Sequence, residues 1–139
     1  MNNFCLDCQE PDPQWVSVNN GVFVCIYCAG QHRGYGVQVS FVRSLQMDKI
    51  DGLHIKMLQY GGNRKFLEFI RLYNITNNDK DRHSKYITKA VELYRRLLME
   101  MAIKGHEMSV DSEIFKDLNK EDGKTLIYDK EYALIGLPI

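Results

Sequence analysis

The sequence of 139 residues lacks any run of 18 apolar residues, so it offers no segment that could span a bilayer as a helix. Its first residues have neither the basic stretch nor the apolar stretch of a secretory signal, and we therefore expect a cytosolic protein. Low-complexity stretches are also missing, and 45% of the residues are hydrophobic, which argues against a disordered chain. The length and composition predict one globular domain with a single modest core.

An excess of either charge is absent as well, since 18 basic and 18 acidic residues balance to a formal net charge of zero. Nucleic-acid-binding modules need several lysines or arginines near the recognition element, and residues 1–45 offer only Arg33 and Arg43. We therefore do not expect nucleic acid as a partner. Residues 80–96 nevertheless carry six basic residues against two acidic ones, whereas residues 107–131 carry eight acidic residues against four lysines. The basic stretch could face phosphates or an anionic surface, or it could be the solvated face of a helix.

The few cysteines that are present form the clearest pattern. Cys5, Cys8, Cys25 and Cys28 make two Cys-x2-Cys pairs separated by 16 residues, which is typical of a tetrahedral structural zinc site. Disulfides are the alternative, but a reducing cytosol would not preserve them. No fifth cysteine is available, so we expect a closed site in which one Zn²⁺ organises the fold and performs no chemistry. We expect His32 to lie beside this site or in the core and not to replace a cysteine ligand.

Short elements surround the second cysteine pair. The pattern predicts two strands, over residues 15–18 and 22–24, joined by an Asn-Asn-Gly turn. A short helix over residues 27–33 and a third strand over residues 37–42 should follow.

The remainder of the chain is predicted to be mainly helical. Apolar residues recur at helical spacing over residues 47–60, about 63–73 and 85–104. Asp48 and Asn63 could cap the first two of these helices. A short helix over residues 112–118 and a strand over residues 125–128 are weakly marked. The predicted fold class is therefore α+β: a small three-stranded sheet with a Cys₄ zinc finger, surrounded by and followed by about five α-helices.

The spacing Cys5-x2-Cys8-x16-Cys25-x2-Cys28-x4-Arg33 closely resembles the signature of the Arf GTPase-activating protein family. The surrounding residues that extend the resemblance are Asp12-Pro13, Trp15, Asn20–Cys25, Gly30–Gly34, Val39–Leu45, Met47-Asp48 and Gly62-Asn63. A weaker likeness continues to Arg95 and is similar to the Golgi-type branch of the family. The resemblance implies a domain over residues 1–105, with the zinc finger over 5–28 and a helical part over about 47–105. Residues 106–139 would be an acidic C-terminal extension without a family counterpart.

The resemblance also implies a function. The chain would stimulate GTP hydrolysis by a GTP-bound Arf-family small GTPase, and it would be an activator and not itself an enzyme. Arg33 would be the arginine finger, inserted in trans, because a planar guanidinium can donate two hydrogen bonds to the phosphoryl group in transfer. The family further implies a monomeric protein of vesicle trafficking, cytoplasmic and held peripherally at Golgi or vesicle membranes through Arf or coat proteins.

Four other residues are candidates for contact with the GTPase. Trp15 could brace Arg33 or touch the GTPase, or it could simply fill the core beside the zinc. Asp48 could orient the interface instead of capping a helix. Arg43 could be a second interface cation or a solvated surface residue. Ile50 stands where the family usually has Trp, near the first long helix.

Two departures from the family pattern leave alternatives open. Gln38 stands where the family usually has His, and Ile50 replaces the usual Trp. Neither removes a cysteine or the arginine, but the change at Ile50 could affect packing or partner contact near the first long helix. An adaptor that binds an Arf without accelerating hydrolysis is therefore one alternative, and a Cys₄ module that binds nucleic acid is another.

Overall fold

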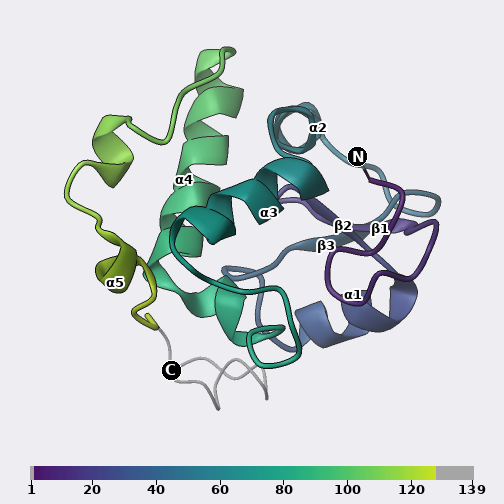
Figure 1. Ribbon diagram of the computed structural model, residues 1–139. Helices are drawn as coiled ribbons and strands as arrows, with labels where there is room; N and C mark the ends of the chain where they lie inside the picture. The colour runs from purple at the N-terminus through teal and green to yellow at the C-terminus, as the bar shows by residue number, and fades with distance from the viewer. Residues whose placement is uncertain (1, 128–139) are drawn as a thin grey trace.

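The computed structural model describes residues 2–127 and shows a small sheet flanked by helices (Figure 1). The sheet and α1 lie on one side of the molecule, whereas α4, α5 and the chain between them lie on the other (Figure 1). The sheet has three strands, and the described chain holds five α-helices, which confirms the predicted α+β fold. The elements in chain order are β1 (Trp15–Ser17), β2 (Val22–Val24), α1 (Ile26–Arg33), β3 (Val42–Ser44), α2 (Gly52–Tyr60), α3 (Asn63–Leu72), the 3₁₀ turn Ser84–Ile87, α4 (Lys89–Lys104), the 3₁₀ turn Glu113–Phe115 and α5 (Lys120–Gly123).

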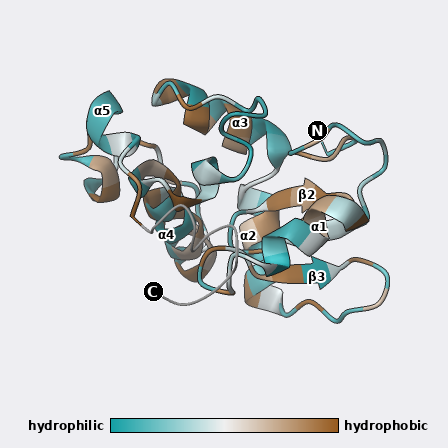
Figure 2. Cartoon of the chain, turned by 90° about the horizontal axis from the view of Figure 1, so that it is seen from below, coloured by the Kyte–Doolittle hydropathy of each residue, from teal (hydrophilic) through white to brown (hydrophobic). Residues whose placement is uncertain are grey.

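The sheet is antiparallel, with β1 in the centre between β2 and β3. Trp15 of β1 is opposite Val24 on one side and Ser44 on the other. β2 is hydrophobic along its whole length, whereas β3 becomes hydrophilic toward its end (Figure 2). Gly21 closes the β1–β2 hairpin with φ +64°, and a Cβ atom at this position would lie 3.0 Å from Leu98 of α4. The hairpin turn thus requires glycine both for its backbone conformation and for the approach of α4.

The third strand does not lie where the alternating pattern predicted it. Residues 37–42 were expected to form it, but β3 covers only Val42–Ser44. Both Val39 and Ser40 donate backbone hydrogen bonds to the carbonyl of Gly36, which makes the preceding residues a turn. The Asn19 side chain accepts a hydrogen bond from the Phe41 amide at 2.8 Å. Side-chain bonds therefore replace part of the expected ladder, and the alternation of apolar residues reflects packing on a turn.

Two predicted helix caps are wrong. α2 begins at Gly52, and its N-cap is Asp51, whose Oδ1 accepts from the His54 amide at 2.9 Å. Asp48 instead accepts from the Ser44 amide at 2.7 Å and closes the turn after β3. Asn63 is the first residue of α3 and makes no cap; its side chain accepts from the Phe23 amide at 2.7 Å. Asp and Asn bond to backbone amides in both turns and caps, so sequence alone does not choose between these roles.

The long predicted helix over residues 85–104 is divided at Thr88. Residues up to Ile87 form the 3₁₀ turn, and Thr88 is the N-cap of α4, accepting from the Val91 amide at 3.3 Å. The short helix predicted over residues 112–118 is only the 3₁₀ turn Glu113–Phe115. The strand predicted over residues 125–128 is an isolated bridge between Leu126 and Thr88, and its residue 128 lies outside the described residues.

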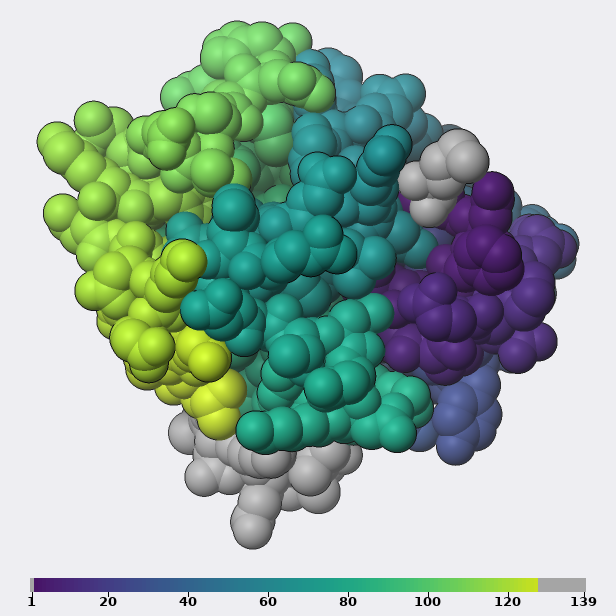
Figure 3. Space-filling model, in the orientation of Figure 1, coloured from purple at the N-terminus to yellow at the C-terminus, as the bar shows by residue number. Residues whose placement is uncertain are grey.

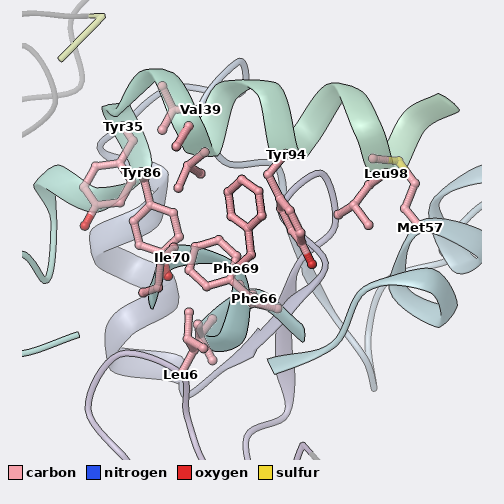
Figure 4. Packing of buried hydrophobic residues seen from close by; sticks show 14 of the residues in the cluster. Leu6, Tyr35, Val39, Met57, Phe66, Phe69, Ile70, Tyr86, Tyr94 and Leu98 are labelled. Atoms are coloured by element: carbon pink, nitrogen blue, oxygen red, sulfur yellow. The ribbon is translucent and has the colours of Figure 1, made fainter. Parts of the chain in front are cut away.

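The core lies between α3 and α4 and is dominated by aromatic rings (Figure 4). Phe66 and Phe69 of α3 meet Tyr86 and Tyr94, with ring centroids 5.7 Å apart for Phe66–Tyr86 and 4.7 Å for Phe69–Tyr94. All four side chains are buried. The predicted helical stripes of aromatic residues are thus the core of the fold.

Candidate metal centre and exposed arginine

The four cysteines converge on one point. Cys5 and Cys8 come from the N-terminal loop, Cys25 is the N-cap of α1, and Cys28 lies in its first turn. All four sulfur atoms lie within 4.8 Å of one another, and the Cys8 and Cys25 sulfurs are 3.6 Å apart. A zinc tetrahedron with bonds of about 2.3 Å separates its sulfurs by about 3.8 Å, so the four thiols fit such an ion.

Hydrogen bonds of the backbone fix the two cysteine loops. The Cys28 amide donates to the Cys25 sulfur at 3.4 Å, which places this sulfur at the positive end of α1. Leu6 joins the first loop to β2 through its amide, 2.9 Å from the carbonyl of Phe23. Because both loops are tied to the same sheet, the positions of the sulfurs follow from the fold of the hairpin.

The thiols also influence one another. Hydrogen bonding with Cys28 lowers the pKa of Cys5 to about 5, and the same bond raises the pKa of Cys28. The cluster therefore favours a thiolate at Cys5 near neutral pH. A divalent cation would extend this preference to all four sulfurs, since thiolates are the metal-binding form.

Arg33 is the last residue of α1 and lies exposed on the surface. Its guanidinium carbon is 4.8 Å from the centre of the Trp15 ring, and Trp15 is buried in β1. No carboxylate of residues 2–127 forms an ion pair with Arg33. Trp15 thus does both things that were proposed for it inside the domain: it packs in the core, and its ring supports the arginine side chain.

A buried polar network behind α1 was not foreseen from the sequence. Asp7, between the first two cysteines, has its Oδ2 2.7 Å from Nε2 of His32 and its Oδ1 2.7 Å from Nζ of Lys85. The Tyr86 hydroxyl donates to the same Oδ1 at 2.6 Å. On the other side of the His32 ring, Nδ1 lies 2.6 Å from the Ser40 hydroxyl. His32 is therefore a buried histidine, one of the two expectations for it, and it is held from two directions.

Charges in this network are compensated inside the protein. Burial opposes the charge of Asp7, but the adjacent Lys85 and His32 outweigh burial and hold the pKa of Asp7 well below its usual range. Burial lowers the pKa of Lys85, and Asp7 offsets part of that effect.

Two of the six basic residues over 80–96 do not belong to a surface, whereas Lys80 and Arg96 are exposed. Lys85 is fully buried against Asp7, and Arg95 is buried and donates to the Asn20 side chain at 3.0 Å. Net charge along the sequence could not reveal these pairs, because their partners lie more than 70 residues away.

The other candidate residues lie apart from one another. Arg43 is opposite Val16 in the sheet, so the strand pleat places it on the face opposite Trp15. Its guanidinium lies 3.9 Å from the Phe41 ring centre. Asp48 holds the turn after β3. Ile50 is half-buried in the segment before α2 and is not part of the core.

An exposed apolar surface on α1 was not foreseen from the sequence. Ile26 and Tyr27 are 70% and 74% exposed, although large apolar side chains in a small domain are usually covered. In a helix, residues three, four and seven positions apart share a face, so Ile26, Gly30 and Arg33 form one exposed row. The sequence shows two large side chains directly after Cys25. The spacing of the cysteines alone assigns no function to these two residues.

In the part of the chain that the structure describes, helices that combine the length and the apolarity needed to cross a membrane do not occur.

Comparison with known proteins gives consistent results. A family model, ArfGap, described as "Putative GTPase activating protein for Arf", matches residues 1–102. The ADP-ribosylation factor GTPase-activating protein 3 of Pongo abelii is 36% identical over 102 residues, which are 73% of this chain and 19% of that protein. The ADP-ribosylation factor GTPase-activating protein GCS1 of Saccharomyces cerevisiae is 43% identical over 74 residues, 53% of this chain and 21% of that protein. The chain thus spans about a fifth of the length of these relatives.

A solved structure is similar as well. It is described as a "putative GTPase activating protein for ADP ribosylation factor from Cryptosporidium parvum", with a TM-score of 0.68 and 28% sequence identity. The similarity covers 73% of this chain and 80% of that chain. Together with the family model, which matches well over half of the residues, this shows that the chain belongs to the ArfGap family.

Proposed function

We propose that this domain stimulates GTP hydrolysis by a GTP-bound Arf-family small GTPase and that Arg33 is the arginine finger. The observation that supports this proposal most directly is the state of Arg33. Its guanidinium is exposed at the end of a helix anchored by two cysteines, rests on the Trp15 ring and has no carboxylate partner among residues 2–127. Such an arginine is available to a partner and already oriented.

The chemistry suits an arginine in particular. Negative charge spreads over the oxygens of the γ-phosphoryl group as it is transferred, and a guanidinium donates a fork of hydrogen bonds to that charge. Arginine fingers accelerate hydrolysis by about 10³- to 10⁵-fold, which corresponds to roughly 4–7 kcal/mol of barrier. The domain itself would not be the enzyme, because the reacting groups belong to the GTPase.

Cys5, Cys8, Cys25 and Cys28 would hold one structural Zn²⁺. With four protein ligands the ion has no open position for a water or substrate, so it contributes stability and no chemical step. The cysteines then determine the start of α1, and the eight-residue helix determines where Arg33 emerges. The Asp7–His32 contact fixes the same helix from its buried side.

The partner surface would extend along the exposed face of α1, where Ile26 and Tyr27 could be covered by an apolar part of the GTPase. Asp48 would contribute by holding the turn that presents Met47, which is 74% exposed. Arg43 and Ile50 stay predicted contacts, and Arg43 would have to act from the opposite face of the sheet.

The proposed unit is residues 1–105, and residues 106–139 would be an acidic C-terminal extension. The proposal also implies a cytoplasmic, peripheral and monomeric protein that works where Arf-family GTPases carry GTP, at Golgi or vesicle membranes.

The test is single-turnover GTP hydrolysis by an Arf loaded with GTP on liposomes. The wild-type domain is compared with Arg33→Ala, with Arg33→Lys and with Arg71→Ala, a control that removes another exposed arginine at a helix end. We expect both Arg33 variants to lose at least about 10³-fold in rate while metal content and fold stay intact, and Arg71→Ala to behave as wild type.

Two results would contradict the proposal. Near-normal rates for Arg33→Lys would show that a fork of hydrogen bonds from this position is not needed. If the wild type binds the GTPase but does not accelerate hydrolysis, the domain is an adaptor, and Ile50→Trp becomes the first reversion to examine.

A further inference from the structure

Buried polar side chains form a continuous chain of hydrogen bonds on the buried side of α1. It runs from a cation to a carboxylate, and its members in order are Arg95, Asn20, Ser17, Ser40, His32 and Asp7. All six residues are buried. The segments that supply them lie far apart in the sequence but meet in the fold: in Figure 3 the purple surface of the N-terminal loop borders the teal surface of the central segment.

The first half of this chain links α4 to the β1–β2 hairpin and to the turn before β3. Nη1 of Arg95 donates to Oδ1 of Asn20 at 3.0 Å. Nδ2 of Asn20 donates to the Ser17 hydroxyl oxygen at 2.8 Å, and the Ser17 and Ser40 hydroxyls lie 2.7 Å apart. The proton of Ser17 goes to Ser40, because its other acceptor, Oδ1 of Asn19, is 3.4 Å away.

The second half of the chain holds His32 at both ring nitrogens. A carboxylate only accepts hydrogen bonds, so Nε2 of His32 carries the proton that it donates to Asp7 at 2.7 Å. Nδ1 can then accept from the Ser40 hydroxyl, 2.6 Å away. Every donor thus points the same way, from Arg95 towards Asp7, and bonds aligned in this manner strengthen one another.

The consequence concerns Arg33, which directly follows His32 at the end of α1. Consecutive residues of a helix point about 100° apart, so a fixed His32 ring on the buried side sets the direction in which Arg33 leaves the exposed side. α1 has only eight residues, and the cysteines hold its first turn. Because helix ends fray, the last turn needs an anchor of its own, and His32 supplies it.

We propose that His32 is a positioning residue for Arg33 and that the bond from Ser40 holds His32 in this role. The inference rests on the proposed function of Arg33, but it makes a separate claim about the free domain. That claim is that the buried chain of hydrogen bonds keeps the Arg33 guanidinium over the Trp15 ring, 4.8 Å from its centre. An arginine ordered in advance loses less freedom when the partner binds.

The test compares hydroxyl deletions inside and outside the chain. Ser40→Ala removes the partner of Nδ1 of His32 but leaves the bond of Nε2. Ser17→Ala breaks the chain one bond further away and should mobilise Arg33 to a smaller extent, which also provides a second variant if Ser40→Ala does not fold. Thr88→Val is the control, because it removes another buried hydroxyl, which caps α4 and takes no part in the chain. Urea denaturation and metal analysis establish the stability and zinc content of each variant.

The first measurement is made on the free, zinc-loaded full chain. ¹⁵N relaxation of the arginine Nε atoms reports the mobility of each guanidinium, and the ring current of Trp15 shifts the signals of Arg33. We expect Ser40→Ala to mobilise Arg33 and to remove most of that shift, while the exposed Arg71 behaves as in the wild type. Thr88→Val should leave both arginines unchanged.

The second measurement is single-turnover hydrolysis by a GTP-loaded Arf over a range of domain concentrations. A misplaced arginine lowers the maximal rate and not the affinity, since the rest of the interface is unchanged. We expect Ser40→Ala to lower the maximal rate about 10-fold while the half-maximal concentration stays the same. Thr88→Val should keep both values.

Three results would overturn the proposal. Unchanged Arg33 signals in Ser40→Ala and Ser17→Ala would show that the chain does not position the arginine. An equal change in Thr88→Val would reveal a general loss of stability. A mobile Arg33 combined with a normal maximal rate would show that its order has no effect on hydrolysis. If the wild-type domain does not stimulate hydrolysis at all, the proposed function fails, and the relaxation data still decide whether the chain orders Arg33.

Discussion

The cysteine half of the domain, residues 4–45, and the helical half, residues 52–104, are held together in different ways. In the helical half, aromatic and aliphatic side chains of α3 and α4 pack into a continuous core. The cysteine half has strands of only three residues and buries a chain of polar side chains, Asp7, Ser17, Asn20, His32, Ser40 and Ser44. Short strands cannot cover enough apolar surface, so directed bonds and the cysteine cluster take over.

The contact between the two halves is both apolar and polar. Leu6, Val22 and Tyr35 of the cysteine half belong to the same buried cluster as the aromatic rings of the helical half. Asn63, Lys85 and Arg95 of the second part of the chain add long-range polar bonds to the cysteine half, and those of Lys85 and Arg95 are buried. Each of these bonds depends on the correct placement of both halves. The comparison therefore teaches that the two halves share one apolar core and that the helical half also completes the polar network of its neighbour.

The largest expected effect is loss of the metal. Cys25→Ser removes one of the four proposed ligands and the helix N-cap, and structural zinc contributes about 10–16 kcal/mol to the folding of zinc-finger peptides. We expect loss of bound zinc and of most circular dichroism from both halves, because the bonds of Asn63, Lys85 and Arg95 to the cysteine half then lose their partners. If the aromatic core stays folded without zinc, the two halves are independent, and the comparison above is wrong.

The next effect is removal of one charge from the buried network. Asp7→Asn keeps the shape but leaves Lys85 buried without a counter-charge, which should destabilise the domain by about 3–5 kcal/mol. Urea denaturation of the zinc-loaded protein measures this, with the exposed Asp117→Asn as the matched control. The double variant Asp7→Asn, Lys85→Met should recover part of the loss; no recovery would show that the ion pair is not the cause.

A hydrocarbon deletion in the helical half should cost somewhat less. Leu98 is fully buried against the β1–β2 hairpin at Gly21, and Leu98→Ala should cost about 3 kcal/mol through the cavity it leaves. Denaturant unfolding compares it with Ile103→Ala on the exposed side of α4, for which we expect almost no change. Similar losses for the two variants would mean that α4 is not packed as described.

The smallest effect on stability concerns Gly30, and it has the opposite sign. A Cβ atom at Gly30 would meet nothing within 4 Å, so the domain itself does not need glycine there. Gly30→Ala should stabilise the folded domain by about 0.5–1 kcal/mol. If the GTPase approaches the row of Ile26, Gly30 and Arg33 closely, the same variant lowers the rate of stimulated hydrolysis.

Gly52→Ala is the matched control for this variant. Gly52 is exposed in α2, and a Cβ atom there would also meet nothing within 4 Å. Thermal unfolding and single-turnover hydrolysis are measured on both variants. Unchanged hydrolysis by Gly30→Ala would mean that this part of α1 is not covered by the partner.

Local patterns made part of this site predictable. Both cysteine pairs, the hairpin between them and the position of Arg33 after Cys28 follow from spacing within 29 residues. His32 was expected beside the cluster or in the core, and it is buried. By contrast, Asp7 shows no local sign of its role, because its partners Lys85 and Tyr86 are nearly 80 residues away.

The sequence by itself determined the fold class, the convergence of four cysteines and the aromatic stripes of the core, because each depends on short-range spacing or on helical and strand periodicity. Only the tertiary structure decided that Asp51 and not Asp48 caps α2, that Lys85 and Arg95 are buried, and that the Tyr94 hydroxyl is buried without a hydrogen-bond partner among residues 2–127. The physical reason is that burial and hydrogen-bond partners are set by distant segments that fold against a residue, and polar side chains can serve several roles until those segments are in place.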